Sequence, residues 1–94
     1  MAIYWSELAL SAFARIGERV EMTAGEAAAR RWRQRVSDRL ELAALLPYAS
    51  RVVPEFNVPT YREVFEDAYR IHYRVVGSDI EVVALFHGAM HLGE

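Results

Sequence analysis

The stretch that decides the fold is Tyr69-Arg70-Ile71-His72-Tyr73-Arg74-Val75-Val76, followed by Gly77-Ser78 and then by Asp79-Ile80-Glu81-Val82-Val83-Ala84-Leu85-Phe86-His87. Both runs are rich in β-branched and aromatic residues, and a two-residue Gly-Ser break between such runs is typical of a β-hairpin. Side chains alternate between the two faces of a strand, so the first strand has one apolar face and one face with Arg70, His72 and Arg74. We expect the apolar face to be buried and the basic face to meet solvent or a partner.

The short loop also fixes a register for this hairpin. The predicted opposed pairs are Val76–Asp79, Arg74–Glu81, His72–Val83 and Arg70–Leu85, with His87 diagonal to Arg70. Arg74 and Glu81 should form a cross-strand ion pair. No acid faces Arg70, which leaves two interpretations open. Its guanidinium binds a phosphate or a partner's carboxylate, or it pairs with Glu55 or Glu63 from another element.

The N-terminal half reads as two helices. Ser6 has the right chemistry to cap the first, and the segment Thr23-Ala24-Gly25-Glu26 matches a capping box that would start the second. Pro47 should end the second helix. The predicted apolar stripes are Ala9, Phe13, Ile16 and Val20 on the first helix, and Ala29, Trp32, Val36, Leu40, Ala43 and Leu46 on the second. Another face of the second helix carries Arg31, Arg35 and Arg39, either as a solvated surface or as a docking face for an acidic partner.

Short extended segments account for the rest of the chain. Residues 2–5, 51–53 and 61–65 read as strands, and residues 57–60 read as a turn. The predicted fold is α+β in the order β-α-α-β-β-β, a single domain over residues 1–94 with the helical hairpin on one face of a mostly antiparallel sheet. The helices should cover Tyr69, Ile71, Tyr73, Val75, Ile80, Val82, Ala84 and Phe86. Arg70, His72, Val83, Leu85 and His87 should then share the open face.

Composition limits the chemistry. The 94 residues are 53% hydrophobic with a net charge of −2, and they include no cysteine. All 11 basic residues are arginine, so lysine chemistry is excluded. We expect no cofactor, and we do not expect the three histidines to form a metal site. No apolar run is long enough to span a membrane and no secretion signal is visible, so we expect a cytoplasmic protein.

Several segments, taken in order, resemble the RelE/ParE family of small bacterial toxins from type II toxin–antitoxin systems. The matching segments are Trp5-Ser6-Glu7 with Ala9 and Leu10, Pro47, Val53-Pro54-Glu55, Arg62-Glu63-Val64, Tyr69-Arg70-Ile71-His72-Tyr73-Arg74-Val75 and Phe86-His87-Gly88. The resemblance implies a toxin held inactive, in a hetero-oligomer, by a cognate antitoxin of the ParD, RelB or Phd kind. The antitoxin would lay an extended or helical segment across the toxin. Candidate binding residues for the antitoxin or the target are Arg31, Arg35, Arg39, Arg62, Arg70, His72, Val83, Leu85 and His87.

The family holds two activities, and the resemblance leaves both open. RelE-like members cut mRNA on the ribosome, whereas ParE-like members poison DNA gyrase. In a ribonuclease, Glu55 would be the general base, Arg70 the phosphate clamp and His87 the general acid. This acidic, lysine-free chain lacks the positive field expected for docking inside a ribosome, which favours the ParE-like activity. A third reading is an inactive interaction module of the same fold.

Overall fold

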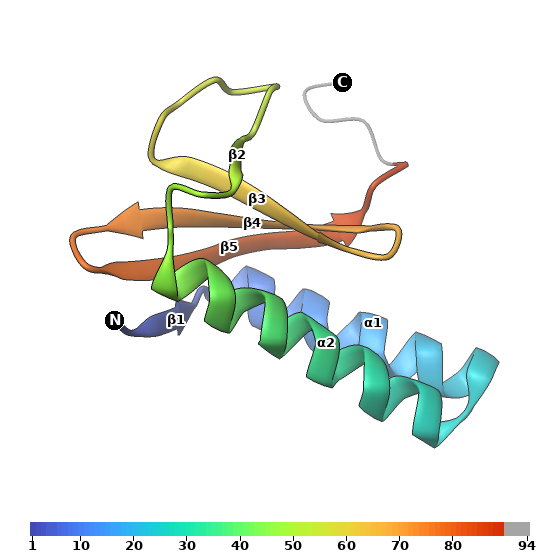
Figure 1. The fold of residues 1–94 in the computed structure, drawn as a ribbon. Helices are drawn as coiled ribbons and strands as arrows, with labels where there is room; N and C mark the ends of the chain where they lie inside the picture. Colours follow the sequence, from blue (N-terminus) through green and yellow to red (C-terminus); the bar gives the residue numbers. More distant parts are fainter. Residues whose placement is uncertain (90–94) are drawn as a thin grey trace.

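A computed structural model of the chain describes residues 1–89. Its elements are β1 (Ile3–Trp5), α1 (Glu7–Ala24), α2 (Glu26–Leu45), β2 (Arg51–Val52), β3 (Tyr61–Glu66), β4 (Tyr69–Val76) and β5 (Asp79–His87). The sheet has the order β1-β5-β4-β3-β2, in which β1 runs parallel to β5 and the other neighbours are antiparallel. Figure 1 shows both helices on one side of the sheet and the β2–β3 loop (residues 53–60) on the other. The α+β prediction is confirmed. The sheet has five strands, each in a segment that the sequence predicted to be extended, although the predicted order β-α-α-β-β-β counted only four.

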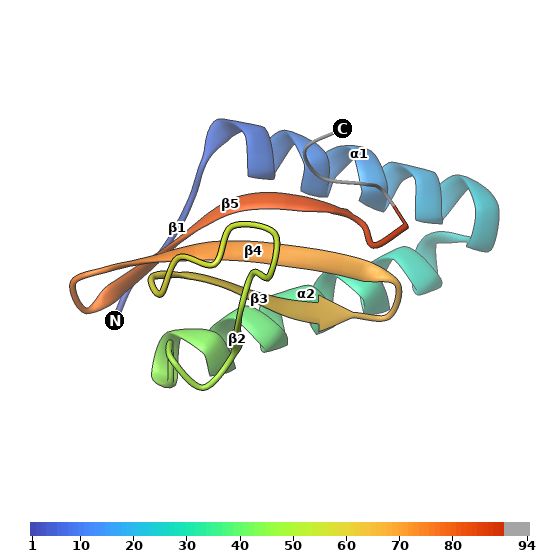
Figure 2. The ribbon, with the colours of Figure 1, turned by 90° about the horizontal axis from the view of Figure 1, so that it is seen from above.

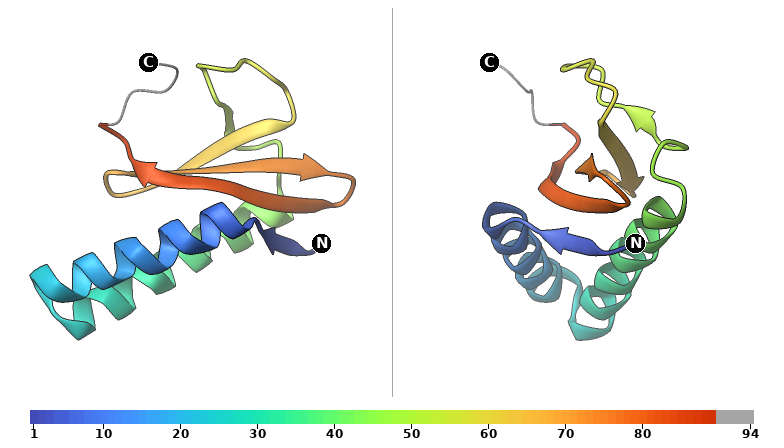
Figure 3. Two further views of the ribbon diagram at one scale, coloured as in Figure 1. Left: turned by 180° about the vertical axis from the view of Figure 1, so that it is seen from behind. Right: turned by 90° about the vertical axis from the view of Figure 1, so that its left-hand side faces the viewer.

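Local sequence features set the start of α1 and the junction between the two helices, but the predicted start of α2 needs a correction. The Ser6 hydroxyl accepts a hydrogen bond from the Ala9 backbone N–H at 3.1 Å and caps α1. The predicted capping box is wrong, because Thr23 still belongs to α1 and its hydroxyl donates to the Arg19 carbonyl. Gly25 alone joins the helices at φ 94°, a conformation that glycine adopts without a steric penalty. This one-residue junction folds α2 back beside α1, as seen from behind in Figure 3.

A single hydrophobic core joins the helices to the sheet. It includes Ile16, Trp32 and Leu40 from the helices and Ile71 and Tyr73 from β4. Aromatic rings continue the contact from one layer to the next, since Phe13 lies 5.4 Å from Trp32 and Trp32 lies 5.5 Å from Tyr69, measured between ring centroids. Leu46, expected in the apolar stripe of α2, lies beyond the end of the helix and is 67% exposed.

The register of the β4–β5 hairpin is the main correction to the sequence analysis. Val76 pairs with Asp79 and Arg74 pairs with Glu81 as predicted, and the Arg74 and Glu81 side chains lie 2.7 Å apart. A β-bulge then leaves Val83 without an opposed residue. The pairs beyond it are His72–Ala84, Arg70–Phe86 and Tyr69–His87, in place of His72–Val83 and Arg70–Leu85.

The bulge moves the second half of β5 by one residue, and its side chains change faces. Leu85 therefore enters the core at 4% exposure, whereas Phe86 lies beside His72 on the face opposite the helices. The predicted exposed strip of Val83 and Leu85 is wrong, as is the placement of Ala84 and Phe86 under the helices. Figure 2 shows the β2–β3 loop passing above β4, over the sheet face that the helices leave free.

Candidate functional site

The site begins at Arg70, which β4 presents on the face opposite the helices. Its Nη1 and Nη2 atoms donate to the two carboxylate oxygens of Glu55 at 2.7 and 2.8 Å. Its Nε atom donates to Glu63 Oε1 at 2.8 Å, and Nη2 lies 2.6 Å from the same oxygen. Arg70 is only 6% exposed. Of the two interpretations left open, the structure therefore shows internal pairing, and with both candidate acids.

Glu63 lies at the centre of this charge cluster. Its carboxylate is buried and receives hydrogen bonds from Arg51, from Arg70 and from the ring of His72, whose Nε2 atom is 3.0 Å from Oε1. A buried carboxylate is stable only when its oxygens are satisfied in this way. We call Glu55, Glu63, Arg70, His72 and Arg51 the Glu63 cluster.

The β2–β3 loop holds Glu55 above the sheet. The backbone N–H groups of Phe56 and Asn57 both donate to the Val53 carbonyl, and Asn57 adopts a positive φ of 53°. This tight turn places the Phe56 ring against Tyr61, with 5.3 Å between the ring centroids. Because the loop lies over it, His72 is 1% exposed, so the expectation of a solvent-exposed basic face is wrong at Arg70 and His72.

The cluster shifts the pKa values of its members. Hydrogen bonds from Arg70 lower the pKa of Glu55 to about 2, and those from Glu55 raise the pKa of Arg70. Burial lowers the pKa of His72 below its usual range, although Glu63 opposes this shift. Near neutral pH His72 is therefore neutral and donates its Nε2–H to Glu63, while Glu55 is a very weak base.

His87 lies apart from the Glu63 cluster. It pairs with Tyr69 in the sheet, and the two rings meet edge to face at 5.5 Å between centroids. Neighbouring residues of a strand point to opposite faces, so His87 and Tyr69 lie on the side of the helices and Arg70 on the other. The structure thus brings Glu55 and Arg70 together and leaves His87 exposed on the opposite face. The predicted proximity of Arg70 and His87 is wrong.

The remaining candidate arginines have two different environments. Arg62 donates to the carbonyls of Pro59 and Ser50, at 2.7 and 2.9 Å, and so anchors the ends of the β2–β3 loop. Arg35 and Arg39 share the buried carboxylate of Glu66, with Nε–Oε distances of 3.0 and 3.3 Å. For Arg31, no ion pair occurs within residues 1–89.

Two further expectations concern metals and membranes. Within residues 1–89, no group of three or more histidine, aspartate or glutamate side chains is arranged to hold a metal ion. His91, the third histidine, lies outside the described residues. Neither α1 nor α2 has the length and apolar character that crossing a membrane requires.

Comparison with known proteins decides the family. The family model described as "ParE toxin of type II toxin-antitoxin system, parDE" matches residues 3–92. The chain belongs to the ParE toxin family. A solved structure titled "Chromosomal ParDE TA system from P. aeruginosa" superposes on this ParE-family chain with a TM-score of 0.76 and 17% identity, covering 93% of this chain and 95% of that one. No curated protein matches the ParE-family sequence.

Glu63 has a larger role in this ParE-family chain than that of a possible partner of Arg70, which is the only role predicted for it from the sequence. Its carboxylate contacts Arg51, Arg70 and His72, more hydrogen-bond partners than any other side chain of the Glu63 cluster has. The signal lay in Asp67-Ala68, a second two-residue loop that separates β3 from β4. Counting back from this loop sets Glu63 opposite His72, which is the pairing that the structure shows.

Proposed function

We propose that this ParE-family chain is a cytoplasmic growth-inhibiting toxin that acts by binding DNA gyrase, and that a cognate antitoxin neutralises it. The observation that carries the choice of gyrase over mRNA cleavage is the occupied state of Arg70. Both of its Nη atoms and its Nε atom already bond to Glu55 and Glu63.

RNA cleavage by attack of a ribose 2′-OH needs a general base, a cation at the phosphorane and a general acid. Glu55, with a pKa lowered to about 2, is a poor acceptor for the hydroxyl proton. Arg70 has its charge balanced by two carboxylates, so it is a weak phosphate clamp. His87 lies on the other face of the sheet and does not reach the same phosphate. These three facts favour a toxin that binds its target over one that cuts RNA.

The test is induction of the chain alone in growing cells, with mRNA integrity and the DNA-damage response followed together. We expect growth arrest with intact mRNA, an induced damage response, and inhibition of gyrase supercoiling by the purified protein. Glu55→Gln and His87→Ala should retain most of the toxicity, because no proton transfer is lost.

The alternative, a ribosome-dependent mRNA endonuclease, makes the opposite forecast. Each of those substitutions would then remove a group worth roughly 10²–10⁴-fold in rate, and arrest would disappear. Glu21→Gln, on the exposed surface of α1, is the matched control for Glu55→Gln. Specific mRNA cuts in the parent that vanish in Glu55→Gln but persist in Glu21→Gln would overturn the gyrase proposal. A chain that arrests nothing in any assay would support the third reading, an inactive interaction module.

A further inference from the structure

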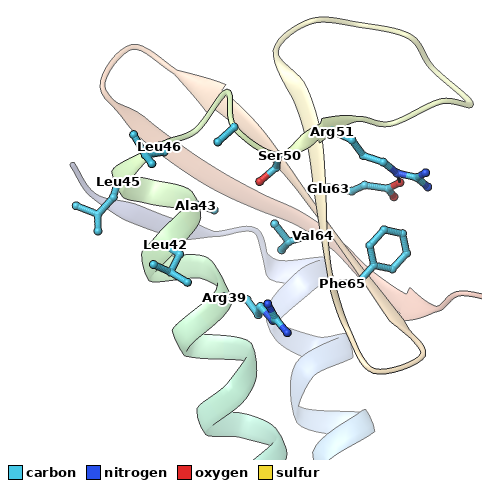
Figure 4. A pocket seen from close by; sticks show the side chains of 11 residues that line it. Arg39, Leu42, Ala43, Leu45, Leu46, Ser50, Arg51, Glu63, Val64 and Phe65 are labelled. Carbon is cyan, nitrogen blue, oxygen red and sulfur yellow. Dashed lines mark hydrogen bonds and ion pairs between the residues drawn. The ribbon is translucent and has the colours of Figure 1, made fainter.

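A groove of about 530 Å³ lies between the C-terminal half of α2 and the outer edge of β3. Figure 4 shows Arg39, Leu42 and Leu46 on the side of α2, with Val64 and Phe65 on the side of β3. We call it the α2–β3 groove. It shares only Arg51 and Glu63 with the Glu63 cluster.

The groove is lined by large apolar side chains that the fold leaves uncovered. Leu42 is 62% exposed, Leu46 67% and Phe65 41%, and all three line this one hollow. Isolated exposed leucines are ordinary on a protein surface, but several lining one groove are typical of an interaction site. The α2–β3 groove therefore offers an apolar surface to a partner.

On the α2 side, the groove continues into a row of arginines, of which Arg39 lines the groove itself. Arg31, Arg35, Arg39 and Leu42 follow each other at spacings of three or four residues on α2, so they lie along one face of that helix, and Leu46 follows directly after the helix ends. Arg35 and Arg39 remain about half exposed while sharing the single carboxylate of Glu66. Arg31, Arg35 and Arg39 outnumber the two carboxylates beside them, Glu66 and the exposed Asp38 on the same helix face, so a positive excess of one charge remains beside the apolar centre. A partner with carboxylates next to apolar side chains would match both.

The edge of β3 beside the groove is open. β2 pairs with β3 only at Arg51–Glu63 and Val52–Arg62. Beyond Glu63, residues 64–66 pair with β4 on one side and with no other strand of residues 1–89. An open edge accepts an added strand through its backbone groups, so an extended segment fits here as well as side chains do.

We propose that the α2–β3 groove is where the antitoxin docks, through a segment with apolar side chains for Leu42, Leu46 and Phe65 and carboxylates for the arginine side. The assignment rests on the proposed neutralisation by an antitoxin and names the surface that it uses. A second copy of this chain fits less well, because a symmetric dimer would bring a second set of arginines to the same patch. This surface replaces the Val83 and Leu85 strip, since the bulge buries Leu85.

The experiment measures the affinity of the purified chain for the protein encoded by the reading frame next to its own, by titration calorimetry. Leu42→Asp and Leu46→Asp should each weaken this complex by at least about tenfold, as expected for a residue at the centre of an interface. Leu10→Asp on α1, an exposed leucine outside the groove, should change the affinity by less than about twofold. Circular dichroism checks that each variant is folded.

Charge gives a second, independent arm. Arg31→Glu should weaken the complex and flatten its dependence on salt, whereas Arg19→Glu on the exposed surface of α1 should not. Unchanged affinity in the Leu42, Leu46 and Arg31 variants would overturn the groove assignment. The assignment would also be overturned if these variants lost growth arrest but kept their affinity for the antitoxin, because the groove would then bind the toxin's target. If the parent chain is a dimer and Leu46→Asp dissociates it, the groove binds a second copy of the chain.

These arms also separate the two proposals. A parent chain that forms no complex with the neighbouring-frame protein would overturn the proposed neutralisation, and the groove assignment with it. A tight parent complex that the groove variants leave intact would overturn the groove assignment alone.

Discussion

At the scale of single residues, two arginines of β4, Arg70 and Arg74, both pair with a glutamate but differ in how much they contribute to stability. Arg74 pairs with Glu81 at the surface, where water and salt screen the attraction. Arg70 is buried against Glu63, which has no exposed side-chain area. Removing an exposed partner leaves a carboxylate that water can solvate. Removing a buried partner leaves a carboxylate that has lost much of its compensation inside the protein.

This difference predicts the outcome of two matched substitutions. Arg70→Ala should lower the free energy of unfolding by about 3–5 kcal/mol, because the buried carboxylate of Glu63 loses an ion-pair partner. Arg74→Ala should lower it by less than about 1 kcal/mol. Urea titration of both variants measures the difference. Equal effects would mean that the Glu63 cluster is solvated in solution. A large effect also warns that lost toxicity in Arg70→Ala reports on folding, so it cannot serve as evidence for catalysis.

His72 makes stability depend on pH. Its folded pKa is lowered by burial from the ordinary 6.5, so the unfolded chain binds more protons near pH 6 than the folded chain does. His72 therefore contributes stability that is complete above pH 6.5 and is lost as the pH falls toward its folded pKa. Glu63, Glu55 and Arg70 face it, and the shift of Glu55 acts only below its ordinary pKa of 4.5. Urea midpoints should fall from pH 7.5 to pH 5.5, and the fall should shrink in His72→Gln. An equal fall in both proteins would assign the effect to another group.

At the scale of elements, the sequence predicts where the strands and helices lie better than it predicts the register of β5 and the end of α1. Hairpin loops, a helix cap and Pro47 are local signals, so the α+β layout and the first half of the β4–β5 register could be predicted. The bulge at Val83 could not, because alternation along β5 is compatible with either register and the choice depends on what Leu85 packs against. The Thr23 capping box is a prediction from a local motif alone, and the structure instead continues α1 through Thr23 to Ala24.

The bulge can be tested with neighbouring residues of β5. Leu85→Ala should cost about 2–5 kcal/mol, because it creates a cavity in the core. Val83→Ala should cost less than about 1 kcal/mol, because Val83 has no opposed residue and lies only partly buried. Thermal or urea unfolding compares the two directly. The reverse order would restore the unbulged register, in which Leu85 lies on the open face.

At the scale of the whole molecule, the two ends of the described chain meet in one sheet. β1 pairs with β5, and the Ser6 backbone N–H at the start of α1 donates to the Val82 carbonyl at 2.9 Å. Within residues 1–89, the helical hairpin has no other layer to cover its apolar face, and the sheet has no other layer to cover Ile71 and Tyr73. Helices and sheet therefore depend on each other for stability.

This mutual dependence predicts that the chain unfolds in a single cooperative transition. Far-UV circular dichroism follows mainly α1 and α2, while fluorescence follows Trp5 in β1 and Trp32 in α2. Both probes should give the same urea midpoint. Ile3→Ala, which loosens β1 against β5, should move both midpoints down together, even though Ile3 lies outside the helices. A Trp5→Phe chain, in which Trp32 is the only tryptophan, checks that the fluorescence change reports the core as well as β1. Helical signal that persists after the fluorescence change is complete would show that the hairpin is stable without the sheet, and would contradict the single-core interpretation.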